Sequence, residues 1–307
     1  MSTILIGVDD TERSQDAIAF GSQIANATGA TVIVANAYPY SDVPRRAADD
    51  TYRRALAEDA KKFAHEMRDR LEGVPDERAL IRVMANPSPA HALHDLAHAE
   101  RAALIIVGST HTGHVGRVLP GSTGERLFHG APCSVAVVPK DYRKQGHGPI
   151  RRIGVAYNGS DEAAAAAQAA AELARAFGAE LDVIGVVDPL SYSTPALMSG
   201  ASEVTISREI ERHVQEGLDE MVASLPSDIT SRSVRLTGPP AEMLAEYSSK
   251  LDLLIMGSRG YGPLRSVLVG GVSGRVVRSA HCPVIVVPRG IEAPLTSLFD
   301  DAASTVA

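Results

Sequence analysis

Two glycine-rich stretches each follow an apolar run and precede a helical pattern. The first, Ile105 to Leu127, reads IIVGSTHTGHVGRVLPGSTGERL, and the second, Ile255 to Val277, reads IMGSRGYGPLRSVLVGGVSGRVV. Glycine lets the backbone pass close to another group, and a helix that begins just afterwards presents free N–H groups and a partial positive charge. This combination is typical of a site for a phosphate or another anion.

A polar residue follows the first apolar run of each half of the chain. Asp9 stands in IGVDDTE and Asn158 in GVAYNGSDE. In a parallel sheet, ligands bind beyond the carboxyl ends of the strands, where the loops after the first and fourth strands meet. An oxygen acceptor opposite a phosphate-binding loop suits ribose hydroxyls, so the pair of loops predicts a nucleotide. Glycine loops are also plain turns, and from the residues alone that interpretation stays open.

Both stretches belong to an internal repeat with a constant offset. Residues 1–140 and 150–289 are therefore expected to be two copies of one domain, joined by a charged linker and followed by a C-terminal tail, 290–307, without a counterpart. Six pairs differ by 149 positions, namely Asp9 and Asn158, Gly29 and Gly178, Gly108 and Gly257, Gly121 and Gly270, Cys133 and Cys282, and Pro139 and Pro288.

Apolar runs typical of strands alternate with helical patterns in each copy. The alternation predicts two repeated α/β domains, each a doubly wound parallel sheet with helices on both faces. In the first copy we expect strands at 4–8, 31–37, 79–84, 104–107 and 134–138, with helices at 14–28, 45–71, 90–100 and 122–128. In the second copy we expect strands at 153–156, 180–187, 230–236, 253–256 and 284–287, with helices at 161–177, 202–224, 241–250 and 272–279.

Composition and charge exclude several classes of protein. The 307 residues carry a formal net charge of −7 and only 4% aromatic residues, and no basic stripe with interleaved aromatics indicates nucleic-acid binding. The first residues lack the pattern of a signal peptide, and no apolar run reaches the roughly 18 residues of a membrane span. Two distant cysteines do not make a disulfide framework. We expect a cytoplasmic protein that binds neither nucleic acid nor membrane.

The usual nucleotide fingerprints are absent, since neither G-x-x-x-x-G-K-[ST] nor a G-x-G-x-x-G after the first strand occurs. The chain instead resembles a tandem universal stress protein over about residues 2–289. The resemblance rests on a G-x2-G-x9-G-[ST] pattern after the fourth strand, the Asp after the first strand, the tandem length, and the closing strands APCSVAVVP and HCPVIVVP. It implies a five-stranded sheet of order 3-2-1-4-5, pairing through the last strands, and ATP binding, with or without Mg²⁺.

Carried over residue by residue, the family pattern is incomplete in both copies. In the first copy His111 replaces the second glycine, and in the second copy Gly271 replaces the hydroxyl residue and Asn158 the aspartate. The resemblance also places adenine against the end of the second strand of each copy. The residues assigned to the nucleotide are Asp9, Ala37, Gly108, Gly121, Ser122 and Thr123 in the first copy, and Asn158, Val186, Gly257, Gly260, Gly270, Gly271, Val272 and Ser273 in the second.

Three functions fit this sequence. The first is a stress-response or regulatory protein that binds ATP as a ligand or switch, which the retained Asp9 and Ser122 favour. The second is a nucleotide-independent dimerisation or scaffold module, which the changes at His111 and Gly271 favour. The third is a slow ATPase, for which no base, lysine or pair of metal-binding carboxylates is evident. We expect the first, with no catalytic residue assigned, and we expect tandem chains to form homodimers and to meet protein partners that the sequence does not identify.

Histidines and cysteines raise further alternatives. His91, His94 and His98 share one face of a predicted helix, which fits either a transition metal or a solvated surface, and the second is favoured. His111 and His114 in the first glycine loop could contact phosphates or titrate near neutral pH, although simple exposure explains them as well. Cys133 and Cys282 are interpreted as small buried residues rather than redox sensors, and no metal site is expected.

Overall fold

A computed structural model describes residues 2–40, 47–109, 122–128, 130–146, 148–189, 203–258, 271–289 and 294–299, with the backbone alone for 47–50, 122 and 203–205. In the first half, the strands are β1 (Thr3–Val8), β2 (Thr31–Tyr38), β3 (Ala79–Ala85), β4 (Leu104–Gly108) and β5 (Ser134–Val138), and the helices are α1 (Arg13–Thr28), α2 (Ala47–Arg68), α3 (Pro89–Ala99) and α4 (Ser122–Phe128). In the second half, the strands are β6 (Arg152–Ala156), β7 (Glu180–Val187), β8 (Ser231–Thr237), β9 (Leu253–Ser258) and β10 (Val284–Pro288), and the helices are α5 (Asp161–Phe177), α7 (Glu203–Ser224), α8 (Pro240–Tyr247) and α9 (Val272–Ser279).

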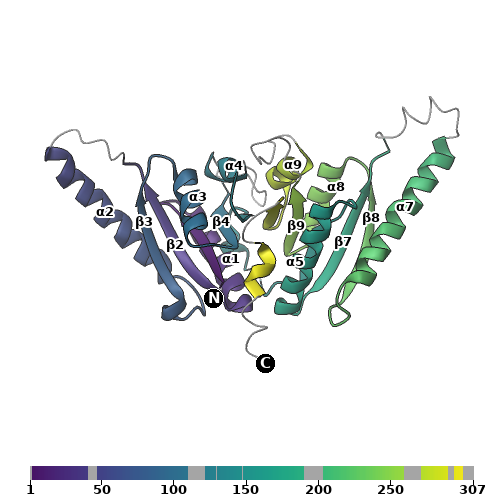
Figure 1. Ribbon diagram of the computed structural model, residues 1–307, viewed down its shortest axis with the longest axis horizontal. Coiled ribbons are helices and arrows are strands. Elements are labelled where there is room, and N and C mark those ends of the chain that lie inside the picture. The colour runs from purple at the N-terminus through teal and green to yellow at the C-terminus, as the bar shows by residue number, and fades with distance from the viewer. Residues whose placement is uncertain are drawn as a thin grey trace.

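The strands of both halves form one ten-stranded sheet, in the order β3-β2-β1-β4-β5-β10-β9-β6-β7-β8. Each half therefore has the expected parallel order 3-2-1-4-5. The halves join through the antiparallel pairing of β5 with β10, in which Ala136 faces Ile285. The two halves lie side by side around this seam (Figure 1). The predicted fold class and the pairing through the last strands are confirmed, whereas the exact domain limits stay predictions.

The inner strands are buried on both faces, as their continuous apolar runs require. Along β1, Ile4 and Ile6 pack into the cluster that contains α1, and Leu5 packs into the opposite cluster with Leu93 of α3. All three β1 side chains are fully buried. Helices therefore cover both faces of the sheet.

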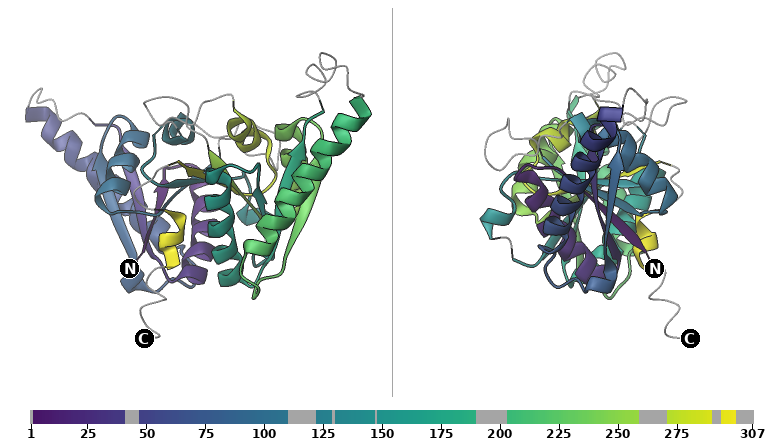
Figure 2. Two further views of the ribbon diagram at one scale, coloured as in Figure 1. Left: turned by 45° about the vertical axis from the view of Figure 1, so that its right-hand side comes forward. Right: turned by 90° about the vertical axis from the view of Figure 1, so that its left-hand side faces the viewer.

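At the centre of the molecule, α1 and α5 lie against each other and each carries a further segment (Figure 2). On α1, the ring of Phe20 meets the ring of Tyr142 edge-on, with 5.9 Å between the centroids, just before the 3-10 helix η2 (Arg143–Gln145). On α5, which is lined by buried alanines, the 3-10 helix η4 (Leu295–Phe299) packs with two buried leucines. Residues after the second copy therefore contribute to the core, which the sequence did not indicate.

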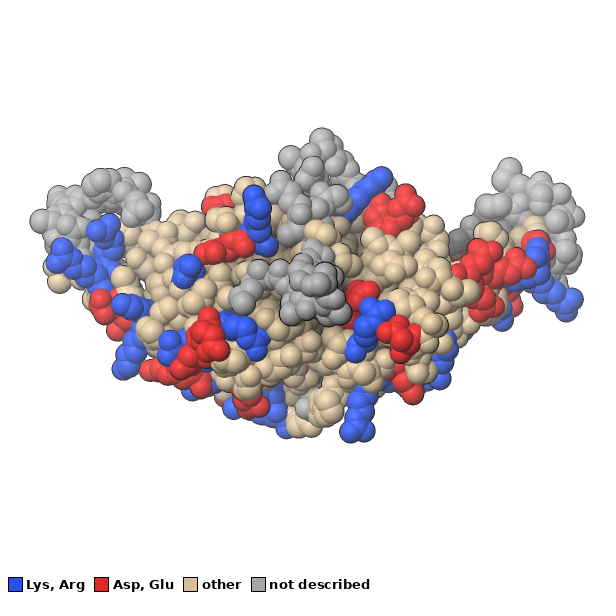
Figure 3. Space-filling view, turned by 60° about the horizontal axis from the view of Figure 1, so that its bottom comes forward, with Lys and Arg blue, Asp and Glu red and all other residues tan. Residues whose placement is uncertain are grey.

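One face of the molecule carries charged side chains of both signs. On the face shown in Figure 3, Lys and Arg side chains alternate with Asp and Glu side chains. Within the described part of the chain, no helix is both long enough and apolar enough to cross a membrane.

Candidate functional site

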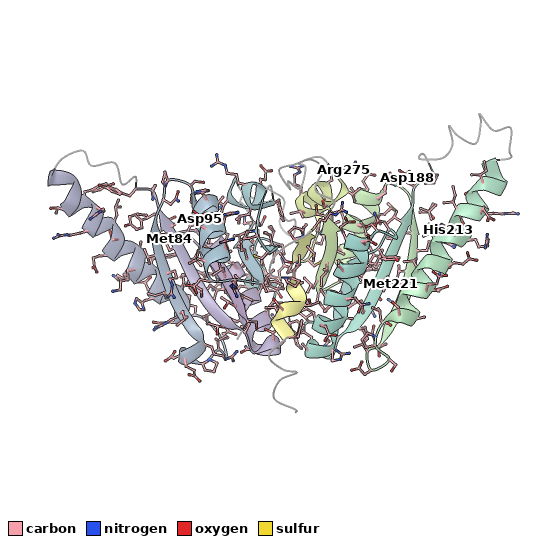
Figure 4. All side chains as sticks on the ribbon, in the orientation of Figure 1. Met84, Asp95, Asp188, His213, Met221 and Arg275 are labelled. Atoms are coloured by element: carbon pink, nitrogen blue, oxygen red, sulfur yellow. The ribbon has the colours of Figure 1, made fainter. Side chains whose placement is uncertain are left out.

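The reversal point of the strand order lies between β1 and β4 in the first half and between β6 and β9 in the second. β1 pairs with β2 on one side and with β4 on the other, and β6 pairs likewise with β7 and β9. Asp9 follows β1 and Gly108 ends β4, so both lie at the carboxyl edge of the sheet. Figure 4 labels Asp188, which follows β7, and Arg275 of α9 in the second half. The carboxyl edge is where a doubly wound sheet binds ligands.

Gly108 and Gly257 are required by packing at this edge. A Cβ on Gly108 would lie 2.3 Å from the backbone oxygen of Arg13, and a Cβ on Gly257 would lie 2.6 Å from the backbone oxygen of Glu162. These distances are shorter than van der Waals contact, so any side chain would force the first turn of α1 or α5 away from the sheet. The fold therefore explains these two glycines whatever the following loops bind.

The carboxylate of Asp9 is held by its own loop and by α1. Its Oδ1 accepts hydrogen bonds from the backbone N–H and hydroxyl of Thr11 and from the hydroxyl of Ser14. Its Oδ2 accepts two from the guanidinium of Arg13. Burial raises the pKa of Asp9, but the hydrogen bonds from Arg13 and Thr11 outweigh it and hold that pKa below 3.8. Asp9 is therefore a fixed anion at the edge of the sheet.

Ser14 holds the same loop from the helix side. Its hydroxyl donates to the backbone oxygen of Asp9 at 2.7 Å and accepts from the Asp9 N–H at 2.8 Å. Ser14 is 1% exposed, so it acts as a buried staple rather than as a nucleophile. In the second half Ala163 takes its place, and Ser160 caps α5 instead by accepting from the N–H of Ala163.

The second half carries different charges around the equivalent position. Asn158 replaces Asp9, and its Oδ1 accepts from the N–H of Ser160 at 3.2 Å. Glu162 replaces Arg13, and its carboxylate lies 3.0 Å from the Nε of Arg289, which directly follows β10. The Glu162 side chain is only 10% exposed. The two halves share the backbone at this position. The first half has the carboxylate of Asp9 paired with Arg13, whereas the second half has the amide of Asn158 and a glutamate, Glu162, in the following helix.

Asn36 is a further polar residue at the first edge. It lies at the end of β2, and its side-chain amide donates to the backbone oxygen of Val8 at 2.9 Å, one residue before Asp9. Asn36 is 8% exposed. It was not singled out in the sequence, although a lone amide within the apolar run TVIVANAY was a usable signal. Gly185 occupies the matching place in β7, so this brace is specific to the first half.

The remaining predicted residues divide into those that the structure places and those that lie outside the described residues. Ala37 and Val186 lie near the ends of β2 and β7 and are half-buried. Ser122 and Thr123 begin α4, and Gly271, Val272 and Ser273 form the start of α9, where Gly271 is exposed. Gly121, Gly260, Gly270, His111 and His114 fall outside the described residues. The assignment of these residues to a ligand stays a prediction.

The histidines of α3 face a carboxylate. Asp95 lies 3.3 Å from the Nε2 of His91 and 3.1 Å from the Nδ1 of His94, and all three side chains are at least two-fifths exposed. Figure 4 shows Asp95 on this helix. Among the residues that the structure describes, no group of three His, Cys, Asp or Glu side chains is arranged to hold a metal ion.

The two cysteines are core residues. Cys133 and Cys282 are both buried and free, before β5 and β10. Burial raises the pKa of Cys133 to about 12 and raises that of Cys282 as well. A thiolate is the reactive form, so these thiols have the character of small apolar side chains.

Comparison with known proteins decides the family. A model described as the universal stress protein family matches residues 1–139 and again residues 149–288. This chain belongs to the universal stress protein family. It is similar to a universal stress protein of Mycolicibacterium smegmatis, with 26% identity over 294 residues that cover 92% of this chain and 96% of the relative. It is also similar to one of Methanocaldococcus jannaschii, with 32% identity over 149 residues that cover 48% of this chain and 86% of the relative.

Solved structures share the fold over almost the whole chain. A universal stress protein from Archaeoglobus fulgidus aligns with a TM-score of 0.69 and 21% identity, covering 94% of this chain and 98% of that chain. A functionally unknown protein from Pseudomonas aeruginosa aligns with a TM-score of 0.64 and 18% identity, covering 99% and 98%. At these identities the likeness supports the tandem fold of the universal stress proteins and nothing finer.

Proposed function

We propose that this universal stress protein binds an adenine nucleotide, ATP above all, as a regulatory ligand in the stress response. The ligand would lie at the carboxyl edge of each half-sheet, between the loop after the first strand and the helix after the fourth. The supporting observation is that Asp9 and Gly108, the last residue of β4, both lie at the reversal point of the strand order. Such a reversal point is the expected place for a nucleotide in a doubly wound sheet.

The residues present suit the parts of a nucleotide. The carboxylate of Asp9 and the amide of Asn158 are hydrogen-bonding groups for ribose hydroxyls. The half-buried ends of β2 and β7, at Ala37 and Val186, offer backbone groups and apolar surface to a base. The starts of α4 and α9 offer N–H groups to phosphates. Mg²⁺ would enter with the phosphates, because no group of three ligands is available among the described side chains.

A regulatory ligand is favoured over a substrate. Ser14, the nearest hydroxyl to Asp9 on α1, is committed to the loop backbone, and Asp9 is held as an anion with a lowered pKa. A general base needs a pKa nearer to neutral. We therefore propose at most slow hydrolysis of ATP. The alternative is a scaffold role without nucleotide, and the experiment must distinguish it from regulatory ATP binding.

The test is a calorimetric titration of ATP into the full chain, beside Thr123→Glu and Ser273→Glu. A glutamate in the first turn is compatible with a helix N-terminus but opposes a phosphate placed there. Each variant should remove one site, and the double variant should remove all binding. Thr123→Gln and Ser273→Gln are the matched controls, because they add similar bulk without charge and should weaken ATP binding far less than the glutamates do. Binding that survives in the double variant would contradict the proposed placement.

A further inference from the structure

We propose that Arg13 is a counterion that the ligand displaces from Asp9, so that the first site accepts phosphorylated nucleotides and discriminates against nucleosides. This inference rests on the proposed function, and it adds a specificity residue that the second half lacks. It is carried by the hydrogen bonds of one carboxylate and by the different charges at the matching position of the second half.

The carboxylate of Asp9 has no acceptor capacity left. Two carboxylate oxygens offer about four lone-pair positions. Four donors already use them, two of Thr11 on Oδ1 and two of Arg13 on Oδ2. The hydroxyl of Ser14, whose one hydrogen is shared with the Asp9 backbone oxygen, also lies against Oδ1. A ribose hydroxyl can therefore donate to Asp9 only if one of these donors leaves.

Arg13 is the donor that can leave. Thr11 is part of the loop, and Ser14 lies buried in the first turn of α1. The hydroxyl of Ser14 also accepts from the backbone N–H of Asp9 and donates to its backbone oxygen. The Arg13 side chain is long, is 27% exposed, and has Asp9 as its only partner among the interactions described. Asp9 itself is 40% exposed, so the pair is open to an incoming ligand.

The backbone of Arg13 lies where the glycine stretch begins. The Arg13 carbonyl and Cβ lie against Gly108, at distances of 2.3 and 2.7 Å from the position of an added Cβ. Arg13 therefore stands beside the end of β4, the strand that precedes the helix proposed to bind phosphates. Guanidinium groups pair readily with phosphate oxygens, often through two hydrogen bonds.

The ligand class follows from what happens to the displaced charge. A nucleoside that takes over Asp9 leaves Arg13 without an anion, whereas a nucleotide supplies one. The second half has no such requirement, because Glu162 stands in place of Arg13 and is paired with Arg289. The first site should therefore distinguish ATP from adenosine much more strongly than the second.

The experiment titrates ATP and adenosine by calorimetry into the full chain carrying Ser273→Glu, so that the first site is measured alone. Arg13→Gln should strengthen adenosine binding and lower the ratio of the adenosine Kd to the ATP Kd at least about fivefold, since a half-exposed ion pair no longer has to be broken. Arg13→Lys keeps the charge but loses the two-pronged contact, so it should give an intermediate ratio. Arg82→Gln removes a surface arginine that pairs with Glu100 and should leave the ratio unchanged.

The outcomes separate this inference from the proposed function. If ATP binds to the parent and Arg13→Gln leaves the ratio unchanged or weakens adenosine, the displaced-counterion role is wrong while the nucleotide site stands. If the parent binds neither ligand, the proposed function of the first site is wrong and the inference falls with it. Thermal unfolding of each variant verifies that a lost signal is not a lost fold.

Discussion

The two halves of the chain share every strand and helix that position the site, yet they differ in the charges at its mouth. In the first half, Asp9 pairs with Arg13 of the following helix. In the second half, Asn158 is neutral and Glu162 reaches across to Arg289. Gly108 at the end of β4 and Gly257 near the end of β9 are shared by both halves, because packing requires them. The comparison teaches that the fold fixes the backbone at this edge of the sheet, while the charged side chains beside it differ between the two halves.

The centre of the molecule shows the same principle in its packing. The first half fills the surface of α1 with Phe20 and Tyr142, and the second half has Ala169 at the position of Phe20. Against α5, the helix that matches α1, the 3-10 helix η4 packs with Leu295 and Leu298, which are 1% and 2% exposed. Two different segments, one from the linker and one from the end of the chain, complete two otherwise matching helices.

The largest expected effects on stability come from truncating the buried side chains of Phe20 and Leu298. Phe20→Ala should lower the free energy of unfolding by about 3–5 kcal/mol and Leu298→Ala by about 2–5 kcal/mol, because each leaves a cavity in a buried cluster. Urea unfolding followed by circular dichroism measures both changes. Ser297→Ala lies on the same 3-10 helix and should change the free energy by less than about 1 kcal/mol. A change of that small size in Leu298→Ala would show that the last helix does not complete the core.

The next effect tests whether the shared glycines are structural. Gly108→Ala and Gly257→Ala should each cost about 1–3 kcal/mol, with Gly108→Ala the more costly because its Cβ comes closer to a backbone oxygen. Gly217→Ala is the matched control, since it lies inside α7 with open space for a Cβ and should stabilise the protein by about 0.5–1 kcal/mol. Denaturant midpoints of the three variants decide the matter, and unchanged stability at Gly108 would mean that only a ligand requires the glycine.

The smallest effect concerns the pH dependence of the two loops. The pKa of Asp9 is lowered from 3.8, so its contribution to stability is present above that value and is lost as the pH falls through the lower folded value. At neutral pH the free energy of unfolding of the wild type should therefore exceed that of Asp9→Asn by at most about 1 kcal/mol, because the ion pair of Asp9 with Arg13 is partly exposed. The difference should vanish in acid.

The second half offers the opposite case. Asn158→Asp would place a carboxylate four residues before Glu162 rather than before an arginine, so the new pKa should be raised and stability should increase as the pH falls. Thermal unfolding temperatures of Asp9→Asn and Asn158→Asp, each compared with wild type, should be measured between neutral pH and about pH 3. This range spans the ordinary pKa of aspartate. The same sign of pH dependence in both halves would contradict the difference in charges described above.

Much of this molecule could be predicted from its sequence, for identifiable reasons. The constant offset between pairs such as Cys133 and Cys282 exposed the repeat, and the apolar runs located the strands because buried parallel strands are apolar on both faces. The sheet order and the seam between the last strands came from the family resemblance, not from periodicity.

The rest depends on long-range contacts that local patterns do not encode. Arg13 looks like any solvated residue in a first helical turn until the structure places it on Asp9. Glu162 and Arg289 are far apart in the chain and meet only because β10 ends beside α5. The last 3-10 helix has no repeat partner, so nothing in the pattern marked Leu295 and Leu298 as core residues.

The most direct test of the account is whether the chain binds ATP at the two proposed edges. The full chain should be freed of bound small molecules, which are identified by mass spectrometry, and titrated with ATP beside the Thr123→Glu and Ser273→Glu double variant. The account predicts saturable binding to the wild-type chain and none to the double variant. No bound nucleotide and no heat with millimolar ATP would contradict it, and the backbone plan that the two edges share would then serve packing alone.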